Sequence, residues 1–222
     1  MRVCEARWLG RVEYSEALTL QEHAVESLGN QQGNEQLILL EHPSVLTLGR
    51  GADAGNILAD STQLESSHIQ VFETGRGGDV TYHGPGQLVG YPIVNLKPDR
   101  CDVHRYVRDL EEVLIRTIAH YGVSGQRVKG LTGVWVGNEK IAAIGVRIAR
   151  WITSHGFALN VNTDLDYFRM IVPCGISDKG VTSLERLLDR TVELAEVAGV
   201  AAEKFGEVFT RRVVHSSVLA SI

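Results

Sequence analysis

Cysteines are few in this sequence, and their spacing excludes a cysteine-based scaffold. The 222 residues contain three, Cys4, Cys101 and Cys174, which lie far apart and form no CxxC pair. We therefore expect neither a disulfide framework nor a structural zinc site. No apolar run approaches the roughly 20 residues that span a bilayer, and the first residues do not resemble a signal peptide. These absences predict a soluble, cytoplasmic protein with no membrane partner.

Positive charge is also scarce. The chain has 22 Lys and Arg against 27 Asp and Glu, a formal net charge of −5. That balance gives no general affinity for nucleic acid, so we expect no nucleic-acid partner. The sequence has no internal repeat, low-complexity segment or linker. With 44% hydrophobic residues, its length predicts one domain over residues 1–222, with a peripheral tail after about residue 210.

Nucleotide-binding loops are missing as well. The most glycine-rich stretch, RGGDVTYHGPG over residues 76–86, lacks the GxxxxGK[ST] pattern. Val80 occupies the position of the third glycine in a dinucleotide-binding fingerprint, and a strand is expected to follow where that fingerprint needs a helix. Gly77 and Gly78 would let a ligand approach the backbone, whose N–H groups could meet a carbonyl or an oxyanion. A purely structural turn explains the same glycines equally well.

Hydrophobic spacing predicts groups of strands separated by helices. Helical spacing begins at Tyr14 and stops near Gly29, and the strongest helical pattern covers 102–122. Apolar β-branched runs on either side of Gly137 and Asn138 predict a hairpin. Further strands are expected at 37–43, 45–50, 69–74, 88–96 and 156–162, and further helices at 182–188 and 194–208. Grouped strands with hairpin connections favour an α+β or mixed α/β fold, with a mixed sheet flanked by helices.

Two side chains are candidate reactive groups. Cys174 lies between a proline and a glycine in VPCGI, which favours a turn and a partly exposed thiol over a buried, inert one. Lys140 is one of only five lysines and opens the apolar stretch KIAAIGV. It is either solvated at the end of a strand or, if it points inward, able to carry protons.

The histidines do not match a metal site. His42, His83 and His155 lie next to glycine or proline, and together with Asp79 they offer metal-binding side chains. Their spacing corresponds to no recognised ligand pattern. We therefore expect no metal.

Several stretches together resemble the lipoyl(octanoyl) transferases, the octanoyl-ACP:protein N-octanoyltransferases. They are RGGDVTYHGPGQLVGYPI, KIAAIGVRIARWITSHGFALNVN and VPCGI, with HPSVLTLGR upstream and RCDVHRYVRDLEE in the central helix. The resemblance runs from about Leu37 to Leu187. It implies the fold of the biotin/lipoate protein ligase catalytic domain. It also implies transfer of an octanoyl group from acyl carrier protein to a lysine of a lipoyl domain, the first step of endogenous lipoate synthesis.

The resemblance assigns roles to particular residues. Cys174 would be the nucleophile that carries the acyl thioester, and Lys140 would favour its thiolate and shuttle protons. The walls of the acyl site would be Arg76, Gly77, Gly78, Asp79, Val80, Thr81, Tyr82 and His83, then Ala143, Ile144 and Gly145, then Gly156, Phe157 and Ala158. Of these, Val80, Ile144 and Phe157 are expected to line an apolar slot for about eight carbons. His83 would orient the carbonyl or a neighbouring group.

The resemblance also implies the partners. The acyl group would arrive activated on the phosphopantetheine of acyl carrier protein, so neither ATP nor a metal is required. The acceptors would be lipoyl domains of 2-oxoacid dehydrogenase complexes and the glycine cleavage H protein. Docking of acidic partners would need a local basic patch, for which the candidates are Arg76, Arg127, Lys129, Arg147 and Arg150. Three alternatives stay open: an ATP-dependent lipoate or biotin ligase of the same fold, a non-catalytic acyl- or carrier-binding protein, and a thioesterase.

Overall fold

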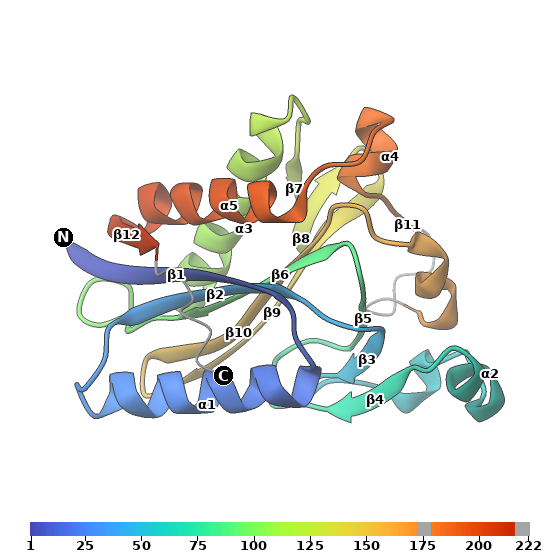
Figure 1. Cartoon of the computed structure of the whole chain (residues 1–222), viewed down its shortest axis with the longest axis horizontal. Helices are drawn as coiled ribbons and strands as arrows, with labels where there is room; N and C mark the ends of the chain where they lie inside the picture. The colour runs from blue at the N-terminus through green and yellow to red at the C-terminus, as the bar shows by residue number, and fades with distance from the viewer. Residues whose placement is uncertain (173–178, 216–222) are drawn as a thin grey trace.

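A large mixed sheet forms the centre of the computed structural model, which describes residues 1–172 and 179–215 (Figure 1). Its order is β12 (Arg211–His215), β1 (Arg2–Arg11), β2 (Glu35–Glu41), β6 (Gln87–Ile93), β10 (Ile152–Asn160), β9 (Glu139–Ala149), β8 (Leu131–Val136) and β7 (Gln126–Val128). A short ninth strand, β11 (Gly180–Val181), pairs with β9. Strand β1 runs parallel to both its neighbours, and β2, β6, β10, β9 and β8 pair antiparallel with one another in that order, whereas β11 runs parallel to β9. The predicted mixed sheet is confirmed, as is the hairpin at Gly137 and Asn138, which joins β8 to β9.

Helices cover both faces of this sheet. Helices α3 (Val103–His120) and α5 (Leu194–Phe209) pack together on one face, and α1 (Tyr14–Gly29) lies on the other (Figure 1). The main hydrophobic core fills the space beneath α3 and α5, and a smaller core lies beneath α1. Helix α1 ends at Gly29 as predicted. Gly122 follows α3 with a φ of 80°, a left-handed conformation that glycine adopts without steric cost.

A second sheet, which the sequence did not predict, has the order β4-β3-β5. Its strands are β3 (Val45–Leu48), β4 (Gln70–Glu73) and β5 (Val80–His83). Strand β5 lies inside the stretch that we interpreted as a single glycine-rich loop. Because successive side chains of a strand point to opposite faces, β5 divides that stretch. Val80 and Tyr82 pack into a third core, whereas Thr81 and His83 point to the opposite face; Val80 also reaches the cavity that Thr81 and His83 line.

Four short helices complete the described part of the chain. They are η1 (Ala54–Asn56), α2 (Ser61–Ser66), η2 (Leu165–Met170) and α4 (Leu184–Leu188). Asp60 caps α2 with a capping box that Gln63 completes. Ser183 caps α4, where we had placed Thr182 at the start of a helix.

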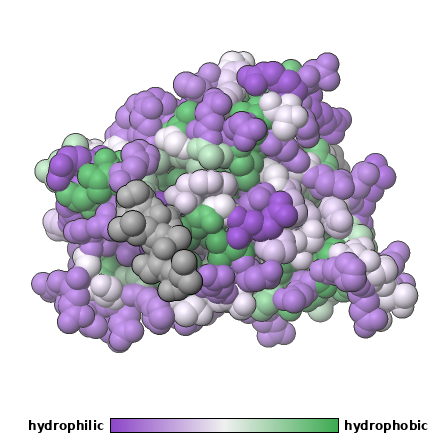
Figure 2. Space-filling view, in the orientation of Figure 1, coloured by the Kyte–Doolittle hydropathy of each residue, from purple (hydrophilic) through white to green (hydrophobic). Residues whose placement is uncertain are grey.

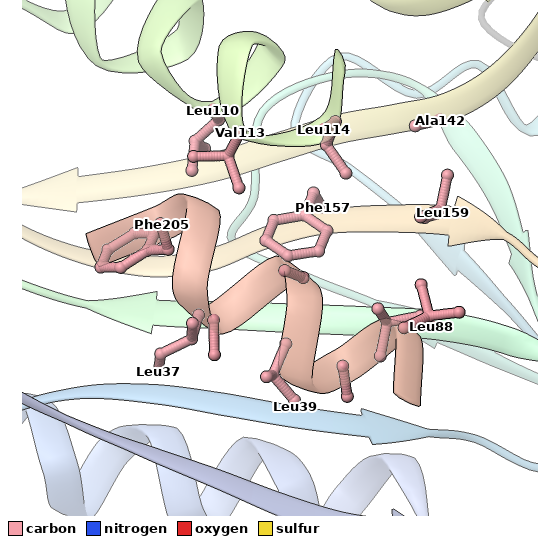
Figure 3. Packing of buried hydrophobic residues seen from close by; sticks show 14 of the residues in the cluster. Leu37, Leu39, Leu88, Leu110, Val113, Leu114, Ala142, Phe157, Leu159 and Phe205 are labelled. Atoms are coloured by element: carbon pink, nitrogen blue, oxygen red, sulfur yellow. The ribbon is translucent and has the colours of Figure 1, made fainter. Parts of the chain in front are cut away.

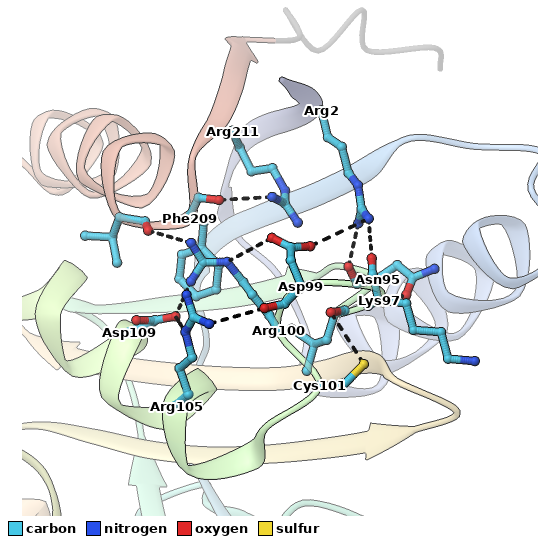
Figure 4. Close-up of polar contacts among 12 residues, drawn as sticks. Arg2, Asn95, Lys97, Asp99, Arg100, Cys101, Arg105, Asp109, Phe209 and Arg211 are labelled. Atoms are coloured by element: carbon cyan, nitrogen blue, oxygen red, sulfur yellow. Dashed lines mark hydrogen bonds and ion pairs between the residues drawn. The ribbon is translucent and has the colours of Figure 1, made fainter.

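Two strands at one end of the large sheet, the edge strand β12 and its neighbour β1, were not predicted. Residues 211–215 form the outermost strand of the sheet, and the buried guanidinium of Arg211 there pairs with the buried carboxylate of Glu35. Nearby, Arg100 pairs with Asp109 and donates a hydrogen bond of 3.0 Å to the carbonyl of Val208 (Figure 4). These charge-assisted bonds fasten the end of α5 to the start of α3.

Hydrophilic side chains cover most of the face seen in Figure 2, with small hydrophobic areas between them. Within residues 1–172 and 179–215, no helix is long and apolar enough to cross a membrane.

Candidate active site

A cavity lies on the α1 face of the large sheet, where small side chains leave the sheet uncovered. Its empty volume, including the part open to solvent, is about 490 Å³. Ala143 on β9 pairs with Ala158 on β10, and Gly145 pairs with Gly156 two residues further along. All four lie on the same face and form the floor of the cavity.

The glycine-rich loop closes one side of the cavity and is held by Arg76. One terminal nitrogen, Nη2, donates to the carbonyl of Thr47 at 2.6 Å and to its hydroxyl at 2.8 Å. The other, Nη1, donates to the carbonyl of Gly77 at 3.1 Å. The side chain is buried among these partners. Arg76 therefore positions the loop over β3, and the prediction that it belongs to an exposed docking patch is wrong.

Four buried side chains enclose the inner end of the cavity: Tyr14, His83, Tyr91 and His155. The Tyr91 hydroxyl donates to Nε2 of His42 at 2.8 Å, and Nδ1 of His42 donates to the carbonyl of Val12 at 2.7 Å. Burial lowers the pKa of His42 to about 4. The imidazole is therefore neutral at physiological pH and the network carries no charge.

A chain of buried amides determines the tautomer of His83. Nδ1 of His83 lies 2.7 Å from Oε1 of Gln87, whose amide nitrogen donates to Oδ1 of Asn160 at 2.9 Å and to the carbonyl of Tyr82 at 3.2 Å. Since Gln87 uses its nitrogen as a donor twice, its oxygen accepts, and Nδ1 of His83 carries the proton. Burial, and next the neighbouring His42, lower the pKa of His83 to about 3. Nε2 is therefore a neutral acceptor on the cavity side.

A second cavity of about 350 Å³ adjoins the first and holds Lys140. The two share Thr81, Ala143 and Ala158 as lining residues. The Lys140 side chain is buried, and its Nζ lies 4.9 Å from the ring centroid of Trp135, within range of a cation–π interaction. Of the two interpretations of Lys140, the inward-pointing one is correct.

Twelve predicted wall residues line the first cavity: Arg76, Gly78, Asp79, Val80, Thr81, His83, Ala143, Ile144, Gly145, Gly156, Phe157 and Ala158. Their role in binding a substrate stays a prediction. Phe157 also packs into the main core, where its ring lies over Gly90 (Figure 3).

Two other predicted wall residues lie elsewhere. The backbone N–H of Gly77 donates to the carbonyl of Val146 at 2.9 Å, which joins the loop to β9. The ring of Tyr82 stacks on Tyr167 with centroids 5.0 Å apart, and its hydroxyl lies 3.1 Å from that of Ser44. The position of Tyr82 follows from the alternation of side chains in β5, which a loop interpretation conceals.

The cysteines differ sharply in their surroundings. Burial in β1 raises the pKa of Cys4 to about 12, so its thiol is inert at neutral pH. Cys101 is exposed at the surface, before α3. Cys174, the predicted nucleophile, lies outside the described residues.

Sequence reasoning missed four lining residues: Tyr14, Val89, Tyr91 and the cavity role of His155. Their apolar or aromatic character indicated only a core, and they come from three separate elements. Among residues 1–172 and 179–215, no group of three or more His, Cys, Asp or Glu side chains is placed to hold a metal ion.

The fold corresponds to a known class of catalytic domain. A family model described as "Lipoyl protein ligase A/B catalytic domain" matches residues 13–206. The structure superposes on a lipoate-protein ligase A bound with ATP with a TM-score of 0.75 at 17% identity, covering 96% of this chain and 90% of the other. A biotin protein ligase from Aquifex aeolicus superposes with a TM-score of 0.58 at 14% identity, covering 93% of this chain and 70% of the other. At such identities the likeness concerns the fold alone.

Curated relatives narrow the class. A protein named octanoyltransferase from Solibacter usitatus is 50% identical over the full length of both chains. An octanoyltransferase from Myxococcus xanthus is 53% identical over 90% of this chain, which spans 58% of that longer relative. The chain therefore belongs to the lipoyl protein ligase A/B catalytic-domain family and, within it, to the octanoyltransferases.

Proposed function

We propose that this octanoyltransferase takes its acyl group from octanoyl-acyl carrier protein, holds it as a thioester on Cys174 and passes it to a lysine of a lipoyl domain. The enzyme would act in lipoate synthesis with no ATP, metal or other cofactor. Lipoyl domains of 2-oxoacid dehydrogenase complexes and the glycine cleavage H protein would be the acceptors, in the cytoplasm.

The observation that carries the proposal is the position of the described residues on either side of Cys174. Phe168, six residues before it, lines the cavity that holds Lys140. Val181, seven residues after it, lines the same cavity and pairs directly with Lys140 in the sheet. Described residues before and after Cys174 in the chain therefore line the Lys140 cavity, which adjoins the cavity floored by small residues.

The proposed chemistry has two half-reactions that balance. In the first, the Cys174 thiolate attacks the carbonyl carbon of the carrier's thioester, a carbon–sulfur bond to Cys174 forms, and the pantetheine thiolate leaves. In the second, the lysine amine of the lipoyl domain attacks the same carbon, an amide forms, and the Cys174 thiolate is released. The acyl carbon keeps its oxidation state throughout, so no redox partner is needed.

Lys140 would serve both half-reactions. An ammonium near Cys174 favours the thiolate over the thiol, which is mostly protonated at neutral pH. The same group would give its proton to the departing pantetheine thiolate and then take one from the attacking amine. The buried position of Lys140 over the Trp135 ring supports this role, since it limits the directions in which Nζ can point.

The proposal is tested by intact-mass measurement after incubation with octanoyl-acyl carrier protein, without ATP or acceptor. We expect an octanoyl adduct, labile to hydroxylamine, on the wild type and on Cys101→Ala, and no adduct on Cys174→Ala. Lys140→Ala should acquire the adduct slowly, whereas Lys179→Ala, whose Nζ also faces the Trp135 ring, should acquire it at the wild-type rate. Adding a lipoyl domain should then move the octanoyl mass to that domain.

Each alternative predicts a different outcome. Modification of the lipoyl domain by free octanoate and ATP, with no adduct on the enzyme, would support a ligase and overturn the proposal. Loss of the adduct to water at the same rate with and without a lipoyl domain would indicate a thioesterase. A protein that binds octanoyl-acyl carrier protein equally well as Cys174→Ala, without turnover in either form, would be a binding module.

A further inference from the structure

His155 has an unusual backbone for a residue inside a strand. Its φ is +55°, a left-handed conformation that costs energy for any residue except glycine. His155 pairs with Val146, which packs against the main core. Regular alternation would place both side chains on that face. Instead the His155 ring lies on the α1 face, with its centroid 6.4 Å from that of the Tyr91 ring.

A hydrogen bond to Gln21 of α1 holds His155 in this conformation. Its backbone N–H donates to Oε1 of Gln21 at 2.7 Å, and both residues are buried. Glycine would adopt the same backbone without strain. A histidine at this strained position therefore indicates that its side chain has a role. Burial, and next Arg76 and Arg147, lower the pKa of His155 to about 4. The ring is therefore neutral at physiological pH and can face an alkyl chain without a buried charge.

A groove of about 510 Å³ lies on the other side of His155, between α1 and the ends of β9 and β10. Leu18, Val25 and Ile152 give it apolar walls, and the exposed residues Glu22 and Arg147 stand where it meets solvent. His155 lines both this groove and the cavity floored by small residues. Its ring therefore stands where the cavity would otherwise continue into the groove.

We infer that His155 determines the length of the acyl chain by closing the inner end of the cavity. An acyl chain that enters from the Lys140 side, as the proposed function requires, runs over Ala143 and Ala158 towards Gly156 and meets His155 next. A chain of about eight carbons ends before the ring, and a longer chain would have to displace it. Without the ring, the chain would continue into the groove beneath α1.

The test replaces the side chain and keeps the backbone. His155→Gly is compatible with the left-handed conformation, and its folding is checked by thermal melting. We expect the ratio of dodecanoyl to octanoyl acylation rates, measured by intact mass with carrier-bound donors, to rise by about tenfold or more. His68→Gly is the matched control, because His68 also has a positive φ, of 52°, and lies beyond α2 away from both cavities. That ratio should stay at the wild-type value in His68→Gly.

A second substitution distinguishes two causes of a gain in dodecanoyl acylation: access to the groove, or a less rigid cavity. Val25→Trp in the His155→Gly background fills the groove from the α1 side and should return the ratio to within about twofold of wild type. The inference is wrong if His155→Gly leaves the ratio unchanged, or if filling the groove fails to reverse the gain. Calorimetric binding of free octanoate and dodecanoate gives the same comparison without acylation. It therefore decides the inference even if the wild type forms no adduct and the proposed function fails.

Discussion

The amide nitrogen of Gln87 donates a hydrogen bond of 2.9 Å to Oδ1 of Asn160, and this bond connects the walls of the two cavities. Both residues line the Lys140 cavity, and Oε1 of Gln87 also accepts a hydrogen bond from Nδ1 of His83, which lines the other cavity. All three are buried, so water cannot replace a lost partner. The pair therefore couples the position of His83 to the sheet beside Lys140.

Replacing Gln87 should destabilise the fold by much more than a surface change. Gln87→Met keeps the shape of the side chain but leaves Nδ1 of His83 and Oδ1 of Asn160 without their partner. Each orphaned buried group costs about 1–3 kcal/mol, so we expect a loss of about 2–5 kcal/mol in the free energy of unfolding. Urea denaturation measures it. The exposed Gln32→Met should change stability by less than about 0.5 kcal/mol, and an equally small effect at Gln87 would contradict the buried network.

A larger side chain on the floor of the cavity should shorten the acyl chain that the enzyme accepts. Ala143→Leu directs a larger side chain into the cavity between Ala158 and the glycine-rich loop. We expect the rate of acylation by an octanoyl thioester to fall about tenfold or more, while a butanoyl thioester reacts nearly as in wild type. The matched control is Ala149→Leu on the same strand, at an exposed position outside this cavity. If octanoyl and butanoyl rates fall together in Ala143→Leu, the floor does not contact the alkyl chain.

Arg76 should not be replaceable by lysine. Its guanidinium contacts both the carbonyl and the hydroxyl of Thr47, and a lysine ammonium on a differently shaped stem does not reproduce the fork. We expect Arg76→Lys to raise KM for octanoyl-acyl carrier protein about tenfold, because the loop that walls the cavity loses its attachment to β3. Steady-state kinetics measures it, with the exposed Arg50→Lys as control. Equal KM values in the two variants would show that the attachment has no part in binding.

Stability should decrease as the pH falls below the ordinary pKa of histidine. The pKa of His42 is about 4 and that of His83 about 3 in the folded protein, against 6.5 for an unperturbed side chain. The unfolded chain therefore binds more protons between pH 6.5 and 4, so stability is complete above pH 6.5 and is lost towards acid pH. Each residue contributes a loss of about 2 kcal/mol at pH 5.

Urea unfolding at pH 7.5, 6.0 and 5.0 tests this dependence. His42→Gln should be less stable than wild type at pH 7.5 but should lose less stability between pH 7.5 and 5.0. His23→Gln, at an exposed position of α1, should keep the wild-type dependence. A dependence of the same size in His42→Gln would assign the acid sensitivity to other groups.

The amino-acid sequence was sufficient for the local structure and for most of the cavity wall. Apolar spacing placed α1 and α3, and the glycine–asparagine pair placed the β8–β9 hairpin, because these signals lie within a few residues of each other. The motif resemblance placed Lys140 and the three wall segments. The resemblance does not show how far apart these residues lie in space. The role of Cys174 as the nucleophile stays a prediction from the resemblance.

Tertiary structure alone decided which side chains face the cavity. The pairing of β5 with β3 decides that Thr81, and not Tyr82, lines the cavity. The position of the Phe157 ring depends on Gly90, because a side chain there would occupy the same space. The inward position of His155 depends on the hydrogen bond that its backbone N–H donates to Gln21, 134 positions away in the chain. The sequence by itself determined which segments line the cavities, because motifs are local. Their orientation was decided by register and by long-range packing, which no local pattern encodes.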